Sequence, residues 1–182
     1  MTTSATAVPP LSVSAVRARR LAYWTRTGAY WLFTLLVASE MVAGAFWDLL
    51  RVEYVRVVLS NLGYPEYLLL ILGIGKLPCA VALLVPGFTR LKEWAYAGAF
   101  FNYAGAAASH YLVGDRAAKW VGPLVFVAFT MLSWALRPEE RKAPRRVPAA
   151  PARPVAWIVP LVIVGLLMII SLATLPVGPP PP

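Results

Sequence analysis

The sequence predicts an all-α polytopic membrane protein, a four-helix transmembrane bundle followed by a fifth C-terminal transmembrane helix. Five apolar runs predict it, since a helix needs about 20 mostly apolar residues to cross a bilayer. The runs cover residues 27–47, 67–85, 94–113, 120–136 and 155–175. The chain is 59% hydrophobic, with a mean hydropathy of +0.66, beyond the usual range of a soluble domain. These runs fill more than half of the 182 residues and leave no room for a sizeable soluble domain.

The basic residues lie unevenly between the runs and predict the orientation of the chain. Twelve of the 17 fall on one side: Arg17, Arg19, Arg20, Arg26, Arg90, Lys92, Arg137, Arg141, Lys142, Arg145, Arg146 and Arg153. Only Arg51, Arg56, Arg116 and Lys119 fall on the other. Because cytoplasmic loops carry the excess of Lys and Arg, we expect an inner (plasma) membrane protein with a cytoplasmic N-terminus and an outer C-terminus. The net charge of +9 therefore indicates contact with anionic lipid rather than with nucleic acid.

The segments around the spans follow in order along the chain. The first 22 residues show no periodic pattern and are predicted to be a mobile cytoplasmic tail. After the first run, apolar residues recur at helical spacing over 52–62, which predicts a short amphipathic helix on the outer surface. The four-span bundle is expected over 23–136. Residues 137–154, rich in Pro and Arg, predict a cytoplasmic linker, and residues 176–182 a Pro-rich outer tail.

Two charged side chains within the spans are the first candidates for a binding site. Glu40 and Lys76 lie at similar depth, roughly 12–14 Å below the outer surface at 1.5 Å per residue, on neighbouring antiparallel helices. A charge inside a span is costly unless it is paired or hydrated. We therefore expect the two to pair, either as a structural ion pair that fixes the rotation of the helices or as a polar site that grips a ligand.

Three further residues carry polar or reactive groups. Asn102 lies in mid-span, where an amide either joins helices by hydrogen bonds or binds a ligand. His110 lies near the outer end of its span, where it titrates near neutral pH or is held by Asp115, a backbone carbonyl or water. Cys79 lies one turn from Lys76 and is interpreted as a small buried side chain, with a redox centre as the alternative. No metal site is expected because no second His or Cys lies at ligand spacing.

Several short motifs follow one another along the chain: residues 62–65 (LGYP), 72–77 (LGIGKL), 84–86 (LVP) and 91–98 (LKEWAYAG), followed by His110 and then Gly114 and Asp115. Together they resemble the DoxX-like family of small bacterial integral membrane proteins. The resemblance covers about residues 25–137 and implies a four-helix membrane bundle. Lys76, His110 and Asp115 coincide with positions where the family pattern carries these residue types. The chain departs from the pattern in its linker and fifth span. It also has Glu40 and Asp48 where many members carry a lysine in the first span.

The resemblance and the residues leave more than one function open. The wider DoxX group includes proteins linked to quinone-dependent sulfur oxidation and to membrane redox complexes. This implies a component that binds a quinone or another apolar ligand through Glu40, Lys76, Asn102 and His110, supported by Asp115 and Cys79. The alternative is a non-catalytic scaffold or assembly factor for a membrane partner or an oligomer. A proton-coupled transporter is a third reading, disfavoured because no inverted repeat is evident. No self-sufficient catalytic constellation stands out, which favours a protein that is not an enzyme.

Overall fold

The computed structural model describes residues 12–142, 158 and 162–169, and all of its regular elements there are helices. Residues 12–142 hold α1 (Val13–Leu49), α2 (Glu53–Asn61), α3 (Tyr67–Leu84), α4 (Thr89–Leu112), α5 (Ala117–Leu136) and the 3-10 turn η1 (Glu139–Arg141), and residues 162–169 are helical as well. Three of them, α1, α3 and α5, are long and apolar enough to cross a membrane. An all-helical membrane protein is thereby confirmed. The crossing by α4 and the fifth crossing stay predictions, and most of residues 155–175 lie outside the described part.

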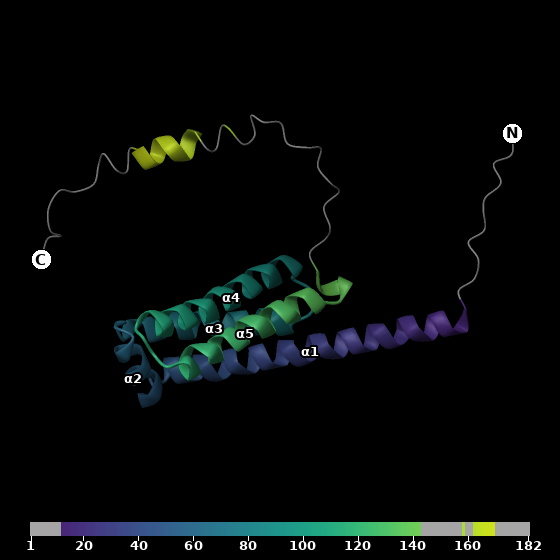
Figure 1. The fold of residues 1–182 in the computed structure, drawn as a ribbon, viewed down its shortest axis with the longest axis horizontal. Coiled ribbons are helices and arrows are strands. Elements are labelled where there is room, and N and C mark those ends of the chain that lie inside the picture. Colours follow the sequence, from purple (N-terminus) through teal and green to yellow (C-terminus); the bar gives the residue numbers. More distant parts are fainter. Residues whose placement is uncertain (1–11, 143–157, 159–161, 170–182) are drawn as a thin grey trace, which may run out of the picture. The chain divides into compact units, whose positions relative to one another are not determined.

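The four long helices run alongside one another, and α2 lies across one end of them (Figure 1). Helix α1 packs on α3 and α5, and α4 packs on the same two helices. Each long helix thus has two neighbours in a closed ring. The chain reverses between them at Gly63, Gly87 and Gly114, all at positive φ, where an L side chain would be strained.

Helix α1 begins ten residues earlier than the sequence analysis expected. The predicted tail over 1–22 therefore needs correction, because the hydroxyl of Ser12 caps the helix by accepting from the backbone N–H of Ala15 at 3.3 Å. The segment that follows contains Ala, Arg and Leu, which favour helix, and no proline. Residues 1–11 lie outside the described part. Residues 12–26 are mostly exposed, and the first part of α1 extends beyond the other helices (Figure 1).

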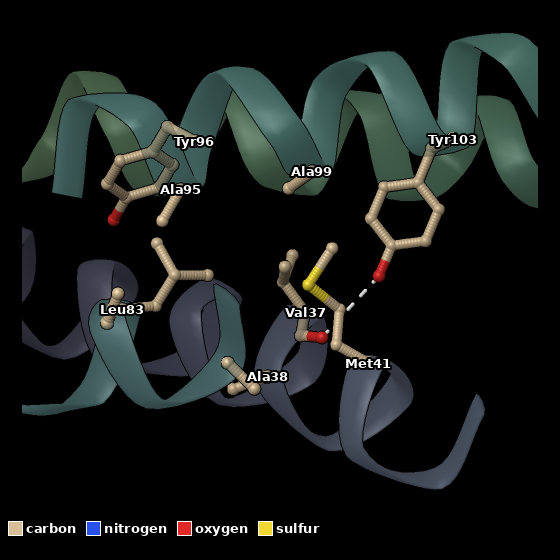
Figure 2. Close-up of a cluster of buried hydrophobic side chains, with 10 residues drawn as sticks. Val37, Ala38, Met41, Leu83, Ala95, Tyr96, Ala99 and Tyr103 are labelled. Atoms are coloured by element: carbon tan, nitrogen blue, oxygen red, sulfur yellow. Dashed lines mark hydrogen bonds between the residues drawn. The ribbon is translucent and has the colours of Figure 1, made fainter. Parts of the chain in front are cut away.

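The interior combines apolar and hydroxyl side chains, while the outside is strongly apolar. Figure 2 shows the centre of the core, where Val37 and Met41 of α1 meet Leu83 of α3 and Tyr103 of α4. Nearby, the Thr34 hydroxyl lies 2.7 Å from that of Ser133, which in turn lies 2.8 Å from the Tyr96 hydroxyl. Large side chains face outward, among them Leu32, Leu35, Ile71, Ile74, Phe101 and Leu132. Such an exterior is expected of helices in lipid, where packing and interhelical hydrogen bonds hold the bundle together.

The start of the predicted linker lies against the bundle. Arg137 forms an ion pair with Glu93 at 2.8 Å, and its guanidinium stacks on Tyr96 and Trp134. Arg141 donates to the carbonyls of Leu83 and Leu84 at 3.1 and 3.2 Å. Residues 137–141, which the sequence analysis places in the linker, therefore contact the helices. The rest of the predicted linker, from residue 143, lies outside the described part.

Helices α1 and α3 lie close together at Gly73. A methyl group placed there would lie 2.6 Å from Cγ of Leu49 and 3.1 Å from the carbonyl of Ala45. We therefore expect Gly73→Ala to lower the free energy of unfolding by about 1–3 kcal/mol, because the two helices must separate. Gly75 on the same helix meets nothing within 4 Å, so Gly75→Ala is the matched control and should raise stability by about 0.5–1 kcal/mol. Thermal unfolding in a mild detergent measures both. A Gly73→Ala protein as stable as the parent would contradict the close approach.

Candidate functional site

A cavity of about 540 Å³ lies within the half of the bundle that α2 covers. Helices α1 to α5 and the α2–α3 loop contribute to its walls: Glu40, Leu59, Leu62, Tyr64, Leu68, Leu72, Lys76, Phe101, Asn102, Tyr103, Gly105, Ala106, Ser109, Gly122, Pro123 and Phe126. Most of these side chains are apolar or small, and only a few are polar. Such a cavity suits an apolar ligand that carries a few hydrogen-bonding groups.

Lys76 is paired with Asp48 and not with Glu40, so the expected Glu40–Lys76 ion pair is wrong. The ammonium of Lys76 lies 2.8 Å from Oδ2 of Asp48, and the two side chains are 13% and 5% exposed. Glu40, Gly44 and Asp48 form one stripe of α1, spaced four residues apart. A methyl placed on Gly44 would lie 3.1 Å from Nζ of Lys76 and 3.2 Å from Oε1 of Glu40. Gly44 therefore leaves room for the lysine to pass over the helix toward Asp48.

Glu40 has a different partner, on α4. Its Oε2 accepts a short hydrogen bond from the hydroxyl of Tyr103. The Tyr103 ring is buried and stacks on Phe126 at 5.2 Å between centroids. Packing thus fixes the hydroxyl that orients Glu40. Both Glu40 and Tyr103 line the cavity, although only Glu40 stands out in the sequence, as a charge within an apolar run.

Asn102 is the polar wall residue that remains available for a ligand. Its side-chain amide forms no hydrogen bond with the residues that the structure describes. It lines the main cavity together with Lys76, and the same two residues line a second cavity of about 200 Å³ between α3 and α4. An amide can donate and accept, and an ammonium has three N–H donors, of which Asp48 takes one. Donors from two helices therefore converge on the cavity.

His110 and Asp115 form a separate polar cluster at the end of α4. Nδ1 of His110 lies 2.7 Å from Oδ2 of Asp115, and Lys119 donates to Oδ1 of Asp115 at 2.9 Å. Neither His110 nor Asp115 is among the residues that line the main cavity. The hydrogen bond from His110 and then that from Lys119 hold the pKa of Asp115 below its usual range. This cluster joins the α4–α5 loop to both helices.

Asp115 should make the protein sensitive to acid. The pKa of Asp115 is lower in the folded chain than in the unfolded chain. Its contribution to the free energy of unfolding is therefore complete above the unfolded pKa of about 3.9, and it is lost as the pH falls through the pKa of the folded chain. Asp115→Asn should therefore lower Tm near neutral pH, and the difference from the parent should shrink below about pH 4. Thermal scans from neutral to acidic pH measure this. A difference in Tm that does not change with pH would contradict the charge-based role.

The α2–α3 loop supplies a contact that the sequence did not indicate. The hydroxyl of Tyr64 lies 2.9 Å from that of Ser109 on α4, and Ser109 donates to the carbonyl of Gly105. Leu59 of α2 is buried and Leu62 follows it, and both line the cavity. The predicted helix over 52–62 is thus present as α2, and its apolar face covers the cavity.

Cys79 lies beside the core, on the side of α3 that faces α4. Its thiol donates to the carbonyl of Ala95 at 3.1 Å, and its side chain packs against the core cluster. Within the described part of the chain, no group of three or more His, Cys, Asp or Glu residues is arranged to hold a metal ion. Cys79 also lines the smaller cavity next to Lys76.

Comparison with known proteins gives one match. The model of the DoxX-like family matches residues 32–133, which include α2, α3, α4, about half of α1, most of α5, and every wall residue of the main cavity. Comparisons with curated proteins and with solved structures give no match. The matched segment is more than half of the chain, and it agrees with the resemblance carried by the sequence motifs. The chain belongs to the DoxX-like family of membrane proteins.

Proposed function

We propose that this multi-pass membrane protein binds a quinone or a similar apolar carbonyl compound, as one component of a membrane redox system. The observation that carries the proposal is the cavity of about 540 Å³ in which Lys76 and Asn102 present hydrogen-bond donors between apolar walls. The distribution of basic residues supports a cytoplasmic N-terminus, which would place α2 and the cavity in the outer half of the bilayer.

Asp48, Lys76 and Asn102 have different roles in binding. Asp48 holds the Lys76 ammonium in place and balances its charge, so that a second N–H of Lys76 is directed to a ligand carbonyl. The Asn102 amide donates to the same carbonyl or to a neighbouring one. Leu68 and Leu72 line the cavity beside the ring or chain of the ligand, and Phe101, which is largely exposed, lies at its edge. This chain supplies the binding step, and a partner subunit would supply or remove the electrons.

Asn102→Leu tests the role of the amide. The substitution keeps the size of the side chain and removes its hydrogen bond to the ligand. One such bond contributes about 0.5–1.5 kcal/mol, so we expect the affinity for the quinone to fall about 2- to 13-fold. A tritiated decyl-tailed quinone titrated into nanodiscs measures the Kd. Ser39→Ala, which removes an exposed hydroxyl on α1, is the control and should bind as the parent does.

Failure of the parent protein to bind the quinone at any concentration below its solubility would overturn the proposed function. Stoichiometric co-purification of another membrane protein, with no ligand bound, would then favour the scaffold or assembly role.

A further inference from the structure

Two cavities meet at the same three side chains. Leu72, Lys76 and Asn102 line both the main cavity and the smaller one of about 200 Å³. The other walls of the smaller cavity are Met41, Ile71, Gly75, Cys79 and Gly98. They come from α1, α3 and α4, without a residue of α2 or of a loop. The smaller cavity therefore lies on the other side of the Lys76–Asn102 pair from the part that α2 covers.

The smaller cavity reaches the surface of the bundle between α3 and α4. Ile71 in its wall is 58% exposed, and Gly75 and Gly98 are exposed as well. A methyl group placed on either glycine would meet nothing within 4 Å. Glycine inside a helix is less favourable than alanine, and neither of these two glycines serves a close approach of backbones. The two glycines, on facing helices, keep this side of the bundle open.

The route toward the outer face is covered by apolar and bonded side chains. Leu59 of α2 and Leu62, just after its end, lie over the main cavity, and Leu59 is only 7% exposed. The bond between the hydroxyls of Tyr64 and Ser109 fastens the loop after α2 to α4. A water-borne molecule would have to displace this cover. An apolar molecule dissolved in the membrane reaches the α3–α4 side directly.

We propose that the smaller cavity is a lateral entrance through which a lipid-soluble ligand passes from the bilayer, between α3 and α4, into the main cavity. Gly75 and Gly98 form its mouth, and Leu72, Lys76 and Asn102 separate it from the main cavity. A ligand that enters here meets the donors of Lys76 and Asn102 first, with its polar head leading. The inference rests on the proposed function, because it concerns the path to that binding site.

Gly98→Leu and Gly75→Leu test the entrance by filling its mouth. Binding and exchange of the tritiated decyl-tailed quinone are measured in nanodiscs. We expect association and dissociation to slow together by about tenfold, with Kd within about twofold of the parent, because an obstructed path changes both rates equally. Gly28→Leu is the matched control. Its glycine is exposed on α1, also has open space around it, and is not among the residues lining either cavity.

The outcomes separate the entrance from the site itself. Unchanged rates in both Gly→Leu variants would overturn the entrance. A weaker Kd caused by faster dissociation alone would also overturn it, since the smaller cavity would then hold part of the bound ligand. Tyr64→Phe breaks the bond to Ser109, and faster association in this variant would show entry beneath α2 instead. Absence of quinone binding by the parent would reject the proposed function, and the entrance with it.

Discussion

Asp48→Asn is expected to lower the free energy of unfolding by about 3–5 kcal/mol, the cost of removing one partner from a buried ion pair. The substitution leaves Lys76 as an uncompensated cation in a low-dielectric site where both side chains are almost fully enclosed. Lys76→Met should cost a similar amount, because Asp48 then loses the ammonium that balances its charge. Reversible unfolding in a mild detergent measures both values.

A double-mutant cycle distinguishes the Asp48–Lys76 pair from a Glu40–Lys76 pair. Asp48→Asn combined with Lys76→Met should destabilise less than the two single changes added together, because no unpaired charge remains. Glu40→Gln combined with Lys76→Met is the matched control, since Glu40 accepts its hydrogen bond from Tyr103. Strong coupling in the control and additive effects in the Asp48 cycle would show that Lys76 pairs with Glu40 after all.

Lys92→Met is expected to destabilise the protein by about 3 kcal/mol, since each buried carbonyl left without a partner costs about 1–3 kcal/mol. Lys92 is fully buried, and its ammonium donates to the carbonyl of Ala82 at 2.6 Å and also to that of Val85. These carbonyls end α3 and have no partner within the helix, so the cation satisfies them and interacts favourably with the helix dipole.

Arg90→Met controls for the loss of a positive charge from the same turn. Arg90 is exposed and lies two residues before Lys92. Its substitution should change the free energy of unfolding by no more than about 0.5 kcal/mol. Equal effects of the two substitutions would contradict the capping role and would indicate that the charge of the segment matters more than the contacts of Lys92.

The positions of the helices were predictable because an apolar run of membrane length has few other structures available to it. The register between helices was not, and Lys76 shows why. Depth alone placed it opposite Glu40, whereas Asp48 lies past the end of the predicted first span and appeared to be outside the membrane. The close approach at Gly73 sets Leu49 against α3, three residues before Lys76, which brings the lysine to Asp48.

The candidate site was predictable only where a polar side chain interrupts an apolar run. Glu40, Lys76 and Asn102 carry that signal, and all three line the main cavity. Tyr64 and Tyr103 do not carry it, because tyrosine is common at the membrane interface, and only packing decides where its hydroxyl points. Arg141 was missed for a related reason: a Pro- and Arg-rich composition predicts an extended segment and does not reveal that one guanidinium binds the end of α3.

The binding of a lipid-soluble carbonyl compound in the main cavity is tested most directly by photolabelling. A decyl-tailed azidobenzoquinone is bound to the full-length protein in nanodiscs, irradiated, and located by mass spectrometry of the peptides. The account predicts labelling in peptides that contain Leu68, Leu72 or Phe101, prevented by an excess of unlabelled quinone. Labelling confined to the exposed N-terminal part of α1, or unaffected by the competitor, would contradict it.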